Sequence, residues 1–223
     1  LTIEAIEHDI ADAFPACPTY RAWTSKMIIA KLKKRDGLTI HTVKEALEQM
    51  LLDGITDVIV QPTHVINGIE NDQMKADALS FRDRFSSIVF GNPLLTTEED
   101  NQAIVRVVAD EFRDMDPDTA LVLMGHGTEH YANTVYAALD YRFKDTGHKN
   151  IFLGTVEAYP APFMIVAGDH AQNDLAGADP DSWMNRLSSE GYEVTPVLKG
   201  LGEYPQVRQI LVEHVQQAMN VSV

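Results

Sequence analysis

The amino-acid sequence contains a single cysteine, Cys17, among 223 residues. One cysteine cannot form an intramolecular disulfide, and it cannot supply the sulfur ligands of a cysteine-built zinc site. The sequence also lacks any apolar run near the ~20 residues that a membrane-spanning helix needs. These two absences exclude a disulfide scaffold and predict a chain without a membrane span.

Positively charged residues are scarce. Lys and Arg total 18 against 33 Asp and Glu, which gives a formal net charge of −15. We expect so acidic a chain to bind neither nucleic acid nor anionic lipid non-specifically, although a local basic patch is compatible with an anionic ligand. The hydrophobic share of 45% and the charged share of 23% are those of an ordinary globular protein.

Several well-known catalytic and nucleotide-binding motifs are missing as well. The sequence contains no Walker loop, no GxGxxG fingerprint, no HExxH zinc motif and no GxSxG nucleophile elbow. The glycines within residues 200–203 are too sparse for a dinucleotide fingerprint and predict a turn before the last helix.

Short apolar runs alternate with helical patterns along the chain. Strands are predicted at residues 57–60, 87–90, 120–124, 150–155, 163–166 and 192–197, with a further candidate at 20–24. Helices are predicted at residues 1–14, 25–37, 42–52, 71–85, from 97 onward, 130–143, 180–190 and 205–219. This alternation predicts an α/β fold with parallel sheets flanked by helices.

The pattern of strands and helices occurs twice, which favours two similar α/β domains. The breakers near residues 93–97 place the boundary, giving an N-terminal domain at 1–95 and a C-terminal domain at 96–223. The last helix is a candidate to pack back on the N-terminal domain.

One connection is too short for a parallel sheet. The strand that ends at Glu157 is followed almost at once by the strand that starts at Phe163. Parallel neighbours need a crossover of about a dozen residues or more. The two strands are therefore antiparallel, or a helix is missing near Pro160 and Ala161. We favour the missing helix, and we likewise expect a first strand before Leu1.

Three side chains at predicted strand ends are candidates for metal chemistry. His126 stands between two glycines after the strand at 120–124, His170 follows a second strand and glycine, and Glu157 closes the strand between them. Neighbouring parallel strands bring their carboxyl ends to one edge of a sheet, where ligands bind. Two imidazoles and one carboxylate are a common set for a divalent metal. The alternatives are a turn histidine, a helix-capping Asp169 and a solvated carboxylate.

The other histidines carry weaker signals. His64 lies in a loop at a strand end and is a candidate to face the same cleft, and His130 lies one helical turn after His126. The remaining histidines are expected at the surface; they are His8, His41, His148 and His214.

Taken together, the motifs resemble one enzyme family. They are residues 124–127 (MGHG), 156–160 (VEAYP), 164–174 (MIVAGDHAQND), 181–183 (DSW) and 200–203 (GLGE), with 21–25 (RAWTS), 27–29 (MII), 35–37 (RDG) and 64–68 (HVING) in the first half. This order resembles the anaerobic sirohydrochlorin cobaltochelatases, which are class II chelatases related to ferrochelatase, and it spans essentially the whole chain.

The resemblance implies two similar Rossmann-like domains with a cleft between them, the chelatase fold. It implies insertion of Co²⁺ into a reduced tetrapyrrole on the anaerobic route to cobalamin, with no organic cofactor. His126 and His170 match the family's metal-binding histidines, and Glu157 matches its acidic partner. The family has a first strand and a helix between the equivalents of Pro160 and Pro162 that this sequence lacks, as the crossover argument also indicates.

The tetrapyrrole carries several carboxylates, so cations must face the cleft of this acidic protein. Arg21 and Lys26 are the candidates, and Trp23 and Trp183 are candidates to border the macrocycle or to lie in the core. Insertion of Fe²⁺ or Ni²⁺ is an alternative, and so is a non-catalytic metal or haem carrier in which His64 or Met residues ligate haem. We expect the protein to be located in the cytoplasm, with the periplasm as the alternative. A homo-oligomer is compatible with the sequence.

Overall fold

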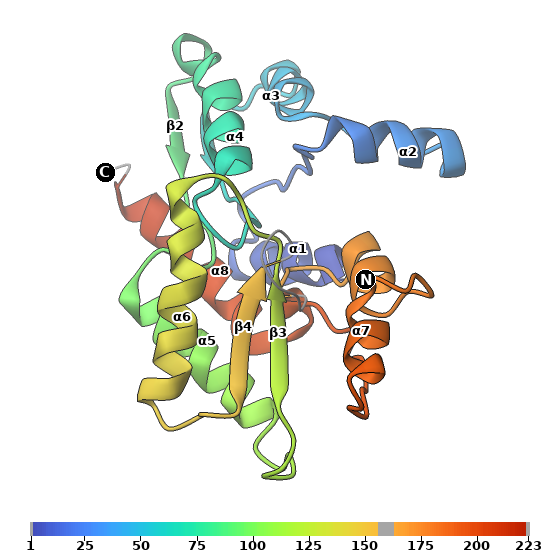
Figure 1. Ribbon diagram of the computed structural model, residues 1–223. Coiled ribbons are helices and arrows are strands. Elements are labelled where there is room, and N and C mark those ends of the chain that lie inside the picture. Colours follow the sequence, from blue (N-terminus) through green and yellow to red (C-terminus); the bar gives the residue numbers. More distant parts are fainter. Residues whose placement is uncertain (1, 156–162, 222–223) are drawn as a thin grey trace.

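The computed structural model describes residues 2–155 and 163–221 (Figure 1). The helices are α1 (Thr2–Ala13), α2 (Lys26–Asp36), α3 (Val43–Leu52), α4 (Ile69–Leu79), α5 (Glu98–Glu111), α6 (Thr134–Asp145), α7 (Trp183–Ser189) and α8 (Pro205–Val221). The strands are β1 (Asp57–Val60), β2 (Ser87–Phe90), β3 (Leu121–Gly125) and β4 (Ile151–Thr155). Short helical turns are η1 (Arg82–Arg84), η2 (Tyr131–Asn133), η3 (Ala171–Leu175) and η4 (Leu201–Glu203).

The strands form two parallel pairs, each flanked by helices. β1 pairs with β2, with Val58 opposite Ile88, and β3 pairs with β4, with Met124 opposite Gly154. Helix α4 contacts β2, and α6 contacts β4 (Figure 1). This arrangement confirms the predicted α/β class with parallel strands between helices.

The four strands lie where short apolar runs predict them. β1 and β2 have the predicted bounds, and β3 and β4 start one residue later than predicted. Their apolar side chains enter two clusters. The smaller one joins Val58 to α3 and α4, and the larger one joins Leu123 and Leu153 to α5, α6 and α8.

Three predicted strands are wrong. At residues 163–166 Phe163 and Ile165 are buried, but the backbone carbonyls of Met164 and Ile165 accept hydrogen bonds from η4 instead of a neighbouring strand. Residues 192–197 are largely exposed and have no strand partner in the part of the chain described. The candidate at 20–24 is reduced to one isolated bridge between Trp23 and Thr42. An apolar pattern makes a strand only where a partner edge is in reach.

The last helix connects both halves of the molecule. Helix α8 contacts α1 and α5, and it also contacts β1 and β2. Ile6 of α1 belongs to the larger apolar cluster together with Leu211 of α8. The domain bounds 1–95 and 96–223 stay a prediction.

The prediction that His214 lies at the surface is wrong. Its side chain is 2% exposed, its Nδ1 lies 3.0 Å from the carbonyl oxygen of Asn92, and its Nε2 lies 3.0 Å from Oδ1 of Asp100. The other oxygen of Asp100 accepts from the backbone N–H of Thr97 at 2.7 Å and so caps α5. One buried pair therefore joins α8 to the start of α5.

The junction around Pro160 and Ala161 lies outside the described residues, so the break expected there stays a prediction. None of the helices in the described ranges combines the length and apolar content that crossing a membrane requires.

Candidate metal site

His126 leaves the end of β3 in a turn that needs both of its flanking glycines. A Cβ on Gly125 would lie 2.6 Å from Cε1 of Tyr136, so the Tyr136 ring packs directly against the backbone there. Gly127 has a φ of 80°, in the left-handed region that favours glycine. The turn leaves the imidazole of His126 exposed at the edge of the sheet.

His170 comes from a separate segment and lies beside His126. Phe163, Ile165 and Ala171 are buried and anchor the segment, whereas the His170 side chain is 47% exposed. The two imidazole centroids are 4.8 Å apart, with the ring planes at 89°. The structure thus brings together two of the three side chains that the sequence predicts for the metal. We call His126 and His170 the candidate metal site.

The hydrogen bonds of both rings leave the same nitrogen available. Nδ1 of His126 lies 3.2 Å from the carbonyl oxygen of Gly127, and Nδ1 of His170 lies 2.5 Å from Oδ2 of Asp174. Both oxygens accept hydrogen bonds, so Nδ1 is the donor in each ring and Nε2 is the nitrogen placed to bind an ion. An ion bound about 2.1 Å from Nε2 lies roughly 3.2 Å from the centroid of that ring. If two imidazoles bind the same ion at an angle between 90° and the tetrahedral value, their centroids are roughly 4.5–5.2 Å apart. The observed separation of 4.8 Å lies within this range.

Asp174 is a residue that the sequence analysis missed. Its carboxylate fixes the tautomer and the orientation of His170, as an outer carboxylate does for many metal-binding histidines. The spacing of four residues along one helical turn was the available signal.

We expect Asp174→Asn to lower the affinity for Co²⁺ by about 10–100-fold, because the amide no longer holds the His170 ring as an anion does. Isothermal titration with Co²⁺ measures this change, and Asp181→Asn, at an exposed carboxylate of the same region, is the matched control. An unchanged affinity in Asp174→Asn would show that the carboxylate does not support the site.

Glu157, the third predicted ligand, lies outside the described residues. Within residues 2–155 and 163–221, no group of three or more His, Cys, Asp or Glu side chains is arranged to hold a metal ion. The part played by Glu157 stays a prediction.

A loop from the first half of the chain approaches the turn after β3. A Cβ on Gly68 would lie 3.8 Å from Oγ1 of Thr128, and Nε2 of His130 lies 3.5 Å from Oδ2 of Asp72. His64 is half-buried in this loop, and burial lowers its pKa. His64 is therefore not the freely exposed ligand that the haem-carrier alternative assumes.

Glu70 is a second charged residue that the sequence analysis did not single out, and its carboxylate acts on groups near the turn after β3. Burial raises the pKa of Tyr136 to about 12, partly offset by a hydrogen bond from the His126 backbone, and the charge of Glu70 adds to the increase. The same carboxylate opposes the effect of burial on the pKa of His64. Its place in the first turn of α4, directly after a strand-end loop, was the available signal.

The predicted tetrapyrrole contacts are spread over the molecule. Arg21 donates to Glu7 of α1 at 2.6 Å, and this bond raises the pKa of Arg21. Trp23 and Trp183 are half-buried, and Lys26 is the exposed first residue of α2. The structure does not join these four to the two imidazoles, so their roles stay predictions.

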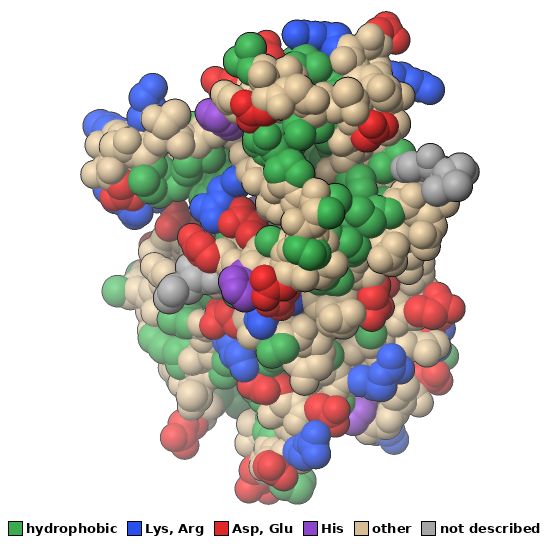
Figure 2. All heavy atoms as spheres, turned by 180° about the vertical axis from the view of Figure 1, so that it is seen from behind, with side chains coloured by type: hydrophobic (Ala, Val, Ile, Leu, Met, Phe, Trp, Pro, Cys, Tyr) green, Lys and Arg blue, Asp and Glu red, His purple; other side chains and the backbone are tan. Residues whose placement is uncertain are grey.

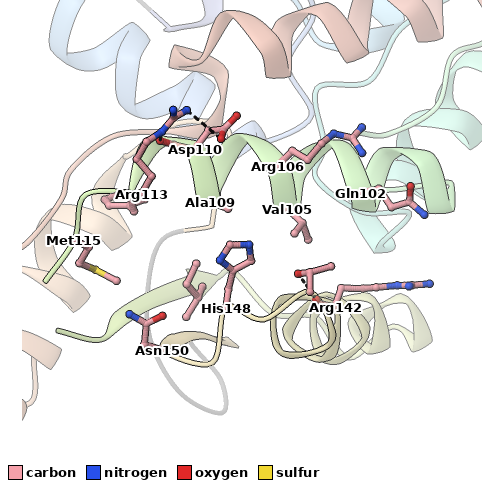
Figure 3. A pocket seen from close by; sticks show the side chains of 13 residues that line it. Gln102, Val105, Arg106, Ala109, Asp110, Arg113, Met115, Arg142, His148 and Asn150 are labelled. Carbon is pink, nitrogen blue, oxygen red and sulfur yellow. Dashed lines mark hydrogen bonds and ion pairs between the residues drawn. The ribbon is translucent and has the colours of Figure 1, made fainter. Parts of the chain in front are cut away.

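A pocket of about 570 Å³ lies elsewhere, between α5 and α6 (Figure 3). Val105 points into it from α5, and His148 faces it from the loop before β4. This loop precedes β4, whereas the candidate metal site lies beyond the carboxyl end of β3. The pocket is therefore separate from the two imidazoles.

Known proteins resemble this chain over nearly all of its length. A family model described as cobalt chelatase (CbiK) matches residues 1–161 and 161–220. A sirohydrochlorin cobaltochelatase of Salmonella typhimurium is 36% identical over 240 residues, which cover 99% of this chain and 90% of the relative. The sirohydrochlorin cobaltochelatase CbiKC of Nitratidesulfovibrio vulgaris is 30% identical over 245 residues, which cover 98% of this chain and 85% of the relative. These matches confirm the resemblance that the motifs indicate.

Proposed function

Since this chain belongs to the cobalt chelatase family, we propose that it is an enzyme that inserts Co²⁺ into sirohydrochlorin, a step of cobalamin biosynthesis. We propose further that His126 and His170 hold the incoming ion and that Glu157 completes the site. The observation that carries this assignment is the pair of imidazoles with centroids 4.8 Å apart, each hydrogen-bonded through Nδ1 and without a hydrogen-bond partner at Nε2 among the described residues.

The proposed chemistry needs a metal site that is incomplete. The ion must shed part of its water and then leave the protein for the four nitrogens of the macrocycle, so two neutral imidazoles suit a transient ligand set better than a closed cage would. Two pyrrole N–H protons must also be removed, and a carboxylate at position 157 would accept them one after the other and pass each to water, or offset the charge of the ion.

The experiment is an anaerobic absorbance assay with sirohydrochlorin and Co²⁺, Fe²⁺ or Ni²⁺ in separate arms. We expect the macrocycle spectrum to change at an enzyme-dependent rate that is greatest with Co²⁺. Preference for Fe²⁺ or Ni²⁺ would reassign the metal, because donor types alone separate these ions poorly. Metal binding without transfer would favour a carrier and overturn the proposal.

We expect Glu157→Gln to lower kcat more than it weakens binding of the tetrapyrrole, because the amide keeps the shape of the side chain and loses its charge and basicity. Steady-state insertion rates and metal-free tetrapyrrole titration separate the two effects. Glu190→Gln, at the exposed residue directly after α7, is the matched control. A loss confined to tetrapyrrole binding would make Glu157 a substrate-positioning residue instead.

A further inference from the structure

Helix α2 concentrates the positive charge of an acidic protein. The chain has 18 Lys and Arg and a net charge of −15, yet this helix of 11 residues carries five of the cations with one acid, Asp36. The five are Lys26, Lys31, Lys33, Lys34 and Arg35. A basic segment on such a background is an electrostatic site for an anion.

The same helix has no buried side chain. Met27 is 80% exposed and Ile28 is 43% exposed. Figure 1 shows α2 extending away from the rest of the molecule, and Figure 2 shows Lys and Arg side chains on several sides of this arm, with hydrophobic atoms between them. A helix in a globular protein normally buries an apolar stripe, so both the charge and the apolar surface of α2 suit a ligand.

One face of α2 contacts the segment that carries His170. Nζ of Lys31 lies 2.6 Å from Oδ2 of Asp169, the residue before His170. Arg35 is one turn further along the same face, and although its main partner is Asp36, the charge of Asp169 also contributes to its raised pKa. Lys33 lies on the opposite face, where its charge helps to lower the pKa of Glu45 at the start of α3.

From this placement we propose that Lys31 and Arg35 bind carboxylates of the tetrapyrrole while its ring nitrogens face His126 and His170; the inference rests on the proposed function. Sirohydrochlorin is a polycarboxylate, so its charge is complementary to that of α2. Lys31 and Asp169 are 56% and 71% exposed, and an ion pair so exposed contributes little to stability. A substrate carboxylate therefore replaces Asp169 at Lys31 with little loss.

The experiment compares the double variant Lys31→Ala/Arg35→Ala with Lys33→Ala, which removes the same kind of charge from the other face of α2. For the double variant we expect the KM for sirohydrochlorin to rise at least about tenfold, because charge-assisted hydrogen bonds are lost. The kcat and the affinity for Co²⁺ alone should stay at the wild-type values. Added salt should raise the KM of the wild type more than that of the double variant. Lys33→Ala should keep KM within about twofold of the wild type.

Failure of this inference differs from failure of the proposed function. A wild-type protein that inserts no metal overturns the function, and metal-free titration of sirohydrochlorin by absorbance still compares its binding to the three proteins. Equal binding by the wild type and the double variant overturns the role of α2. An equal loss in Lys33→Ala also overturns it, because a general charge effect would then replace a specific face.

Discussion

Replacing either His126 or His170 by alanine is expected to reduce cobalt insertion by more than about 100-fold. Loss of an outer hydrogen-bond partner of a metal ligand already costs about 10–100-fold, and here the ligand itself is removed. The imidazoles are 4.8 Å apart, so either one alone would leave the ion with half of the nitrogen ligands that the described residues bring together. The absorbance assay with saturating sirohydrochlorin measures the loss, and titration with Co²⁺ shows whether it arises at metal binding.

The fold should survive both substitutions, because both side chains are exposed at the edge of the sheet. We expect the thermal midpoint to stay within about 2 °C of the wild type. His8→Ala is the matched control, since this imidazole is 73% exposed on α1 and makes no part of the candidate metal site. Wild-type insertion rates in both His126→Ala and His170→Ala would exclude the site.

Local patterns predict much of the fold because they report burial directly. The run at Asp57–Val60 is rich in branched apolar residues and becomes β1 with the predicted bounds. Residues 163–166 have the same kind of pattern, and Phe163 and Ile165 are indeed buried, yet their backbone bonds go to Leu201 and Gly202. Apolar periodicity predicts which side chains are buried, whereas the backbone partner depends on a segment distant in the sequence.

In the candidate metal site, too, local patterns predict individual residues but not the contacts between residues distant in the sequence. His126 and His170 could be predicted because each follows a strand-like run and a glycine. The contact of Lys31 with Asp169 joins residues 138 positions apart, and no local pattern indicates it. The pairing of His214 with Asp100 likewise spans 114 positions, so a polar residue on an amphipathic helix was assigned to the surface.

The buried pair of His214 and Asp100 gives the second prediction with a large expected effect. Both nitrogens of His214 face acceptor oxygens at 3.0 Å, Nδ1 the carbonyl oxygen of Asn92 and Nε2 the carboxylate of Asp100. His214→Leu fills the space with an apolar side chain and leaves the Asp100 carboxylate buried without its His214 partner. Breaking one side of a buried ion pair costs about 3–5 kcal/mol, which lowers the midpoint of a chain of this size by roughly 6–20 °C. Urea and thermal unfolding measure both quantities, with His8→Leu as the control.

The effect of His214→Leu should depend on pH with a definite sign. Burial alone would raise the pKa of Asp100, but the hydrogen bonds from His214 and Thr97 outweigh it and lower the pKa below the usual value. A carboxyl with a lowered pKa in the folded state stabilises the protein above its unfolded value of about 3.9, and it loses that contribution as the pH falls through the folded pKa. The difference in unfolding free energy between wild type and His214→Leu should therefore shrink as the pH falls and Asp100 is protonated, in the variant first, because burial there raises the pKa of Asp100 without the opposing His214 hydrogen bond. A difference under about 1 kcal/mol at pH 7, or one that does not change as Asp100 is protonated, would show that the pair does not hold α8 against α5.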